Sequence, residues 1–95
     1  MRAAHAAMAP LADAIIAPAS PGPAPVWNPM ANDAADNPRP TGDPSCNAGT
    51  SALGCPAVTV PLLAVRGLPM GVQLIGQPHQ DARMVALARW LAGAA

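Results

Sequence analysis

GCPAVTVPLLAVRGLPMGVQLIG, residues 54–76, holds two apolar segments that are typical of β-strands. The segments are Ala57–Val60 and Met70–Ile75, and each is rich in β-branched residues and closed by proline or glycine. Arg66-Gly67 between them has the composition of a turn. This stretch therefore predicts a pair of strands joined by a turn, with one proline ending the first strand and another preceding the second.

The second strand of this pair is expected to be buried on both faces. Because side chains alternate across a strand, one face carries Met70, Val72 and Leu74, and the other carries Gly71, Gln73 and Ile75. Neither face is suited to water, so the strand needs cover on both sides. A chain of 95 residues whose only aromatic residues are two tryptophans can supply little of that cover.

Short elements are predicted before the strand pair. Met1–Ala9 is rich in alanine and favours a helix, which Pro10 ends or kinks. The apolar run Ala12–Pro18 is compatible with a short buried strand. Asn47 is expected to cap a short helix that Gly54 ends.

A long loop separates these elements. Residues 19–45 are rich in proline, asparagine and aspartate, and they show neither helical nor strand periodicity. Such a stretch predicts a loop laid over a surface. A loop of this length is unusual inside a compact domain, where it is usually functional or dependent on its surroundings.

Gln80–Ala92 has the clearest helical pattern in the chain. Its apolar residues recur at helical spacing, at Met84, Leu87, Ala88 and Leu91. Asp81 suits the positive first turn of a helix, Arg89 suits the last turn, and Gly93 is expected to end it.

Charge points to no particular partner. Five arginines balance five aspartates, so the net charge is zero and no basic patch is available for nucleic acid or an anionic membrane. No uninterrupted apolar run reaches the length of a membrane span. We therefore expect a cytoplasmic protein that binds neither nucleic acid nor membrane.

The N-terminus leaves one alternative open. Arg2 precedes the apolar run Leu11–Ala17, and small residues follow it, as in a secretory signal peptide. Asp13 interrupts that apolar run, and Pro18 is poorly placed for cleavage. The cytoplasmic interpretation is therefore preferred.

The two cysteines do not predict a metal site. Cys46 and Cys55 lie far from CxxC spacing and have no histidine near them in the sequence. We expect two inert, partly buried thiols in a reducing compartment, and no metal or cofactor. The alternative is a small secreted proline-rich module that a Cys46–Cys55 disulfide closes.

No residue of the chain is predicted to be catalytic. Residues 49–54 approach the nucleophile-elbow motif, but the second glycine stands one position late, so Ser51 is expected to lie in a short helix. A serine nucleophile also needs a base within hydrogen-bond reach. His5 and His79 are the only histidines, and both are expected to face solvent.

Four blocks, taken in order, closely resemble the C-terminal end of the amidase signature hydrolases. They are residues 13–25, 41–45, 51–61 and 67–76, so the resemblance covers nearly the whole chain. The most specific parts are LG-x-PA-x-x-VP and GLP-x-G-V-QLIG, with a helix after them. The resemblance implies an α/β fold in which this chain is a fragment. It would contribute a short strand, a strand pair and a C-terminal helix to a large mixed β-sheet covered by helices.

The family implies hydrolysis of an amide by a serine nucleophile, activated through a cis-serine and a lysine. Backbone amides of a Gly/Ser-rich loop stabilise the oxyanion. This chain contains no lysine and no Gly/Ser-rich loop, so no catalytic residue carries over. Whether the chain itself is an enzyme is therefore left open.

The resemblance also implies a partial domain. Residues 1–95 would be the C-terminal end of an amidase domain, from a truncated gene, a split gene or a misplaced start, and inactive alone. The alternative is a non-catalytic subunit that completes the sheet of a separate N-terminal amidase polypeptide, because its strands need cover.

The loop around Asp43 and Cys46 resembles a region that borders the substrate pocket in the family. These two residues are therefore the candidates for substrate binding, with turn formation as the alternative for Asp43. The family commonly places Phe where Cys46 stands and Pro-Trp where Gly49-Thr50 stands. This difference implies either a changed pocket wall or a relaxed constraint.

Overall fold

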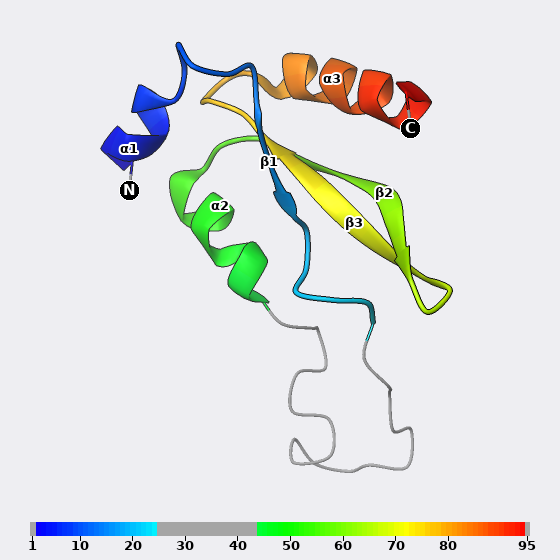
Figure 1. Cartoon of the computed structure of the whole chain (residues 1–95). Helices are drawn as coiled ribbons and strands as arrows, with labels where there is room; N and C mark the ends of the chain where they lie inside the picture. The colour runs from blue at the N-terminus through cyan, green and yellow to red at the C-terminus, as the bar shows by residue number, and fades with distance from the viewer. Residues whose placement is uncertain (1, 25–43, 95) are drawn as a thin grey trace.

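The fold combines short helices with one small sheet. It was obtained as a computed structural model and describes residues 2–24 and 44–94. The elements in chain order are α1 (Arg2–Ala7), β1 (Ile15–Pro18), the 3₁₀ helix η1 (Pro44–Cys46), α2 (Ala48–Leu53), β2 (Ala57–Val65), β3 (Leu68–Ile75) and α3 (Asp81–Ala94) (Figure 1). The predicted α/β class, with a short strand, a strand pair and a C-terminal helix, is confirmed.

The sheet is antiparallel and has the strand order β1-β3-β2. The central strand β3 places Leu74 between Ile16 of β1 and Val58 of β2. The strand β3 is covered on both faces, as its pattern requires, since Leu74 is 4% exposed and its neighbour Gln73, on the opposite face, is 2% exposed. At these two positions the expectation that the chain supplies little cover is wrong, because β1, β2 and the elements packed on the sheet bury them. A central strand with this burial fixes the position of everything attached to it.

The turn between β2 and β3 is confirmed, whereas the strand ends lie further out than predicted. Arg66 and Gly67 both have positive φ, 53° and 79°, which gives the tight two-residue turn favoured in hairpins. Pro61 does not end the first strand, because β2 continues to Val65. The register shifts between Val60 and Leu63, and such an irregularity accommodates a proline, which has no N–H for the ladder.

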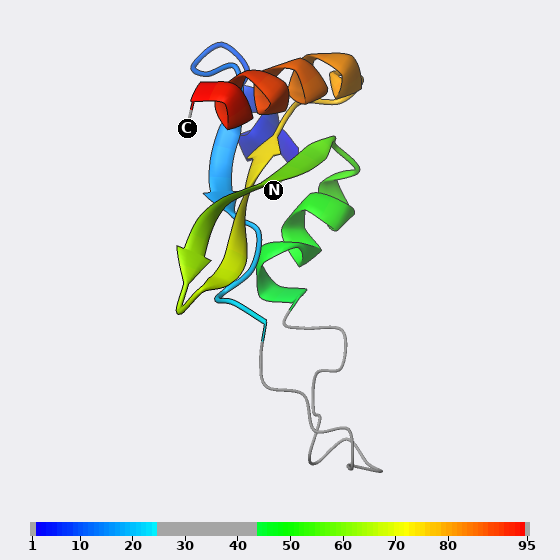
Figure 2. The same cartoon turned by 90° about the vertical axis from the view of Figure 1, so that its right-hand side faces the viewer.

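The core lies between the sheet and α3, which crosses one end of the hairpin (Figure 2). Its buried members are Val60, Leu74, Met84 and Ala88. The predicted apolar stripe of the C-terminal helix is confirmed, because Leu87 and Leu91 pack around the same cluster. The absence of a side chain at Gly76 allows Met84 to pack directly against the backbone there, since a Cβ at this position would lie 2.6 Å from the Met84 Cγ.

Two predicted helix boundaries differ in detail. Gly93 does not end α3, which continues to Ala94 and leaves Arg89 before its last turn. Glycine in a final turn costs a helix little more than its lost conformational entropy.

Asn47 stands at the N-cap of α2, but its side chain makes no capping bond. The preceding 3₁₀ turn holds it at helical φ and ψ, −116° and −20°, away from the extended backbone that a capping side chain needs. Gly54 ends α2 in the left-handed conformation, as predicted.

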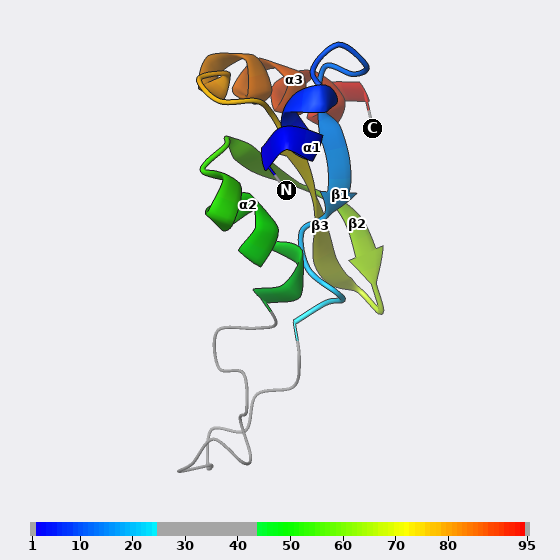
Figure 3. The same cartoon turned by 90° about the vertical axis from the view of Figure 1, so that its left-hand side faces the viewer.

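The prediction that His5 faces solvent is wrong. Helix α1 lies against the corner that joins β3 to α3, and His5 is 9% exposed there (Figure 3). Its Nε2 lies 2.8 Å from the carbonyl oxygen of Gly76, and the Gln77 side-chain amide donates to the His5 carbonyl at 2.7 Å. Because a carbonyl only accepts, Nε2 must carry the hydrogen. The chain's other histidine, His79, is exposed as expected.

Replacing His5 with alanine is expected to lower the free energy of unfolding by about 1–3 kcal/mol, because the buried Gly76 carbonyl loses its side-chain donor. Urea denaturation followed by circular dichroism measures the change. His79→Asn is the matched control, since His79 is exposed at a φ of 67° that asparagine tolerates. Equal stabilities of the two variants would contradict the structural role of His5.

Within residues 2–24 and 44–94, no helix has the length and apolar character that crossing a membrane requires.

Candidate functional site

Of the two predicted substrate-binding residues, Cys46 can be located and Asp43 lies outside the described residues. Cys46 ends η1, immediately before α2, and its side chain is half-buried. Its carbonyl oxygen accepts a hydrogen bond from the Gln73 side chain at 2.8 Å. The turn that carries Cys46 is therefore attached to the central strand of the sheet.

Gln73 makes a second bond of the same kind. Its Nε2 also donates to the carbonyl oxygen of Pro18, the last residue of β1, at 2.9 Å. We call this arrangement, one side-chain amide bonded to the carbonyls of Pro18 and Cys46, the Gln73 bridge. Sequence reasoning placed Gln73 on a strand face but missed the bridge. The sequence feature that could have indicated the bridge is a single polar side chain within an apolar strand that is buried on both faces, because a buried amide needs hydrogen-bond partners.

The backbone after β1 also lies close to β3. The amide of Ala19 donates to the carbonyl of Gly71 at 3.0 Å. A Cβ at Gly71 would lie 2.5 Å from the Thr59 Cγ2 and 3.3 Å from the Ala19 Cβ. Gly71 is thus the position at which the chain leaving β1 can approach the central strand.

The two cysteines are separate thiols. Cys46 and Cys55 are both half-buried, and neither is part of a disulfide. The Cys55 thiol donates a weak bond to the carbonyl of Leu53, with a sulfur–oxygen distance of 3.7 Å. In the part of the chain that is described, no three His, Cys, Asp or Glu residues come together to hold a metal ion.

The serine and histidines considered for catalysis do not meet. Ser51 lies in α2, as predicted, and is exposed. The Nε2 of His5 donates to the Gly76 carbonyl, and neither histidine is hydrogen-bonded to Ser51. These groups therefore do not form a nucleophile and base pair.

A shallow cleft lies between the turn after α1 and the end of β3. Met8, Asp13, Ile15 and Ile75 contribute to its lining, and its volume is about 10 Å³. That volume is about what one water molecule needs. The cleft is too small for an amide substrate. Asp13, which is part of this lining, forms an exposed ion pair with Arg83 at the start of α3.

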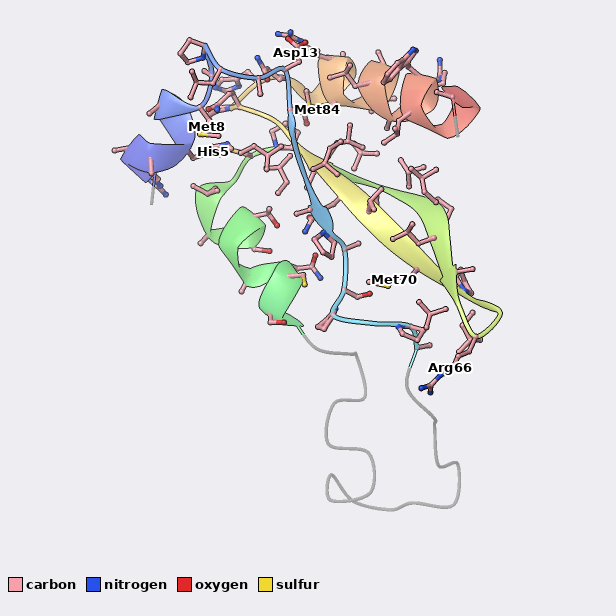
Figure 4. All side chains as sticks on the ribbon, in the orientation of Figure 1. His5, Met8, Asp13, Arg66, Met70 and Met84 are labelled. Carbon is pink, nitrogen blue, oxygen red and sulfur yellow. The ribbon has the colours of Figure 1, made fainter. Side chains whose placement is uncertain are left out.

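The sheet face under α3 continues beyond the helix. Paired residues of neighbouring strands share a face, so Leu63 opposite Met70 and Val65 opposite Leu68 extend the face of Val60 and Val72 toward the hairpin tip. This end of the hairpin projects away from α3, with Arg66 at its tip (Figure 4). Three of its residues, Leu63, Val65 and Leu68, are 48%, 36% and 43% exposed. We call them the apolar extension.

Comparison with known proteins found two short similarities, both to the A subunit of glutamyl-tRNA(Gln) amidotransferase. The chain is 44% identical over 43 residues to the protein of Symbiobacterium thermophilum, a match that covers 45% of this chain and 9% of the relative. It is 45% identical over 42 residues to the mitochondrial protein of Xenopus laevis, with coverage of 43% and 8%.

No protein-family profile matches the chain. No solved structure matches it significantly either. The chain thus corresponds to less than a tenth of the length of the curated relatives that it matches, and it is similar to amidotransferase A subunits within that part.

Proposed function

We propose that this chain is the C-terminal portion of an amidase-type hydrolase that cleaves carboxamide C–N bonds. The observation that carries the proposal is the similarity, over 43 residues, to the A subunit of an amidotransferase, a class of protein that belongs to the amidase signature family. The order of the four sequence blocks supports the same assignment. Residues 1–95 are then part of one larger amidase domain.

In this proposal the chain shapes the enzyme and does not supply the reacting groups. The family's nucleophilic mechanism needs a lysine, which this chain lacks. The chain's own contribution is a rigid central strand, β3, and a turn attached to it that ends at Cys46. Cys46, together with Asp43 from outside the described residues, borders the substrate pocket in this proposal.

A chimera tests the proposal. The segment of the Symbiobacterium thermophilum relative that matches this chain is replaced by the corresponding residues of this chain, and amide cleavage is measured. We expect the chimera to cleave amide substrate, while the 95-residue chain alone and the relative with the segment deleted show no cleavage. A chimera that folds, as judged by circular dichroism, but has no activity would contradict the proposal.

A second candidate function is that of a non-catalytic subunit that completes the sheet of a separate N-terminal amidase polypeptide. The apolar extension favours it, because three large aliphatic side chains exposed on one sheet face suit a protein interface. The outer edges of β1 and β2 also carry no further strand within the described residues.

A co-expression experiment, read together with the chimera, separates the two candidate functions. Co-expressing this chain with the relative that lacks the segment tests association of two polypeptides. Restored activity and co-purification of both chains would support the subunit function. Activity of the chimera without complementation by the separate chain would support the first candidate and contradict the second.

A further inference from the structure

We propose that Gln73 is a positioning residue that holds the Cys46 turn at a fixed place beside the end of β1. The importance of this turn for a substrate pocket rests on the proposed function. The positioning itself is argued from the contacts of Gln73.

The chemistry of the Gln73 bridge admits one orientation of the amide. Both partners, the Pro18 and Cys46 oxygens, are backbone carbonyls that can only accept hydrogen bonds. The NH₂ end of the side chain must therefore face them, and its two hydrogens match the two acceptors. To make the same pair of bonds, a side chain needs two N–H donors on one nitrogen at the distance from the backbone that glutamine provides.

The bridge starts from a rigid base. Gln73 is paired with Ala17 on one side and Thr59 on the other, so its backbone is held by both neighbouring strands. Its side chain is 2% exposed, so water cannot readily replace either bond. The central strand thus fixes the donor, and the donor fixes the two carbonyls.

The two carbonyls belong to segments that are far from Gln73 and from each other in the sequence. Pro18 ends β1, and Cys46 ends η1. The end of β1 has a second hydrogen bond to β3, because the Ala19 amide donates to the Gly71 carbonyl. On the η1 side, the Gln73 amide donates to the carbonyl of Cys46. Loss of the amide is therefore expected to loosen the Cys46 turn.

The thiol of Cys46 provides a direct readout, and that of Cys55 an internal reference. The rate of alkylation of each thiol is measured in the native 95-residue chain by mass spectrometry of the two cysteine peptides. Methionine has about the length of glutamine and no donor. We expect Gln73→Met to raise the Cys46 rate about tenfold, consistent with the loss of two hydrogen bonds. The Cys55 rate should stay within about twofold of its value in the unaltered chain.

Gln77→Met is the matched control. It removes a glutamine amide that donates to the His5 carbonyl, away from Cys46. We expect it to leave the ratio of the Cys46 rate to the Cys55 rate unchanged. An equal rise of both rates in Gln73→Met would reflect general loosening and would overturn the positioning role, as would no change in either rate.

A measurement on the unaltered chain covers the case in which Gln73→Met does not fold. The side-chain NH₂ protons of Gln73 should exchange with solvent far more slowly than those of the half-buried Gln77, as detected by NMR. Equal exchange would overturn the proposal. Because neither readout requires amide cleavage, an inactive chimera with a raised Cys46 rate would refute the proposed function and leave the role of Gln73 standing.

Discussion

Replacing Met84 with alanine is expected to lower the free energy of unfolding by about 2–5 kcal/mol. Met84 is the one large side chain among the described residues that is fully buried, and it fills the space between α3 and the sheet beside Leu74. Alanine would leave a cavity there. Small domains have a total stability of about 5–15 kcal/mol, so the loss would be a large fraction of it.

Urea denaturation at constant pH measures this loss. Met8→Ala is the control, because Met8 is 39% exposed and its truncation should cost much less. A change below about 1 kcal/mol for Met84→Ala would mean that α3 does not form the main core contact of the chain.

Replacing Gly76 with alanine is expected to cost about 1–3 kcal/mol through overpacking. The added Cβ would lie 2.6 Å from the Met84 Cγ, 2.9 Å from its Sδ and 3.2 Å from the Pro56 Cγ. The backbone at Gly76 is not in the left-handed region, so the cost is steric. Gly93→Ala is the matched control, since it meets nothing within 4 Å and should be neutral or stabilising.

The double variant Gly76→Ala/Met84→Ala tests the cause of both losses. With the methionine removed, the new Cβ no longer meets Cγ and Sδ and fills part of the cavity. The double variant should therefore lose less stability than the sum of the two single changes. Strict additivity, measured by the same urea titrations, would contradict a direct contact between the two positions.

The elements that the sequence predicted are those encoded by neighbouring residues. The period of α3 and the turn at Arg66-Gly67 depend on spacing within a few positions, and both were predicted correctly. Predictions from neighbouring residues were wrong where the surrounding strand pairing or a preceding turn changed the local backbone conformation. Pro61 continues a strand because the register shift absorbs it, and Asn47 does not cap because η1 precedes it.

Side-chain contacts between residues far apart in the sequence, including those of the candidate site, could not be predicted in this way. His5 bonds to a carbonyl 71 residues away, and Gln73 bonds to one 55 residues away. No periodicity within a helix or strand reports such a pairing. Cys46 was identified through the family resemblance alone, and its attachment to Gln73 required the three-dimensional arrangement.

The sheet topology has a consequence for how the chain folds. The β2–β3 hairpin closes over a two-residue turn and needs only local contacts, whereas β1 pairs Ile15 with Ile75 from the other end of the chain. Closing the larger loop carries the larger entropic cost, so the hairpin and α3 are expected to assemble before β1 docks. The carbonyl of Pro18 would then meet Gln73 only when β1 docks, so the Gln73 bridge is completed in the last step of folding.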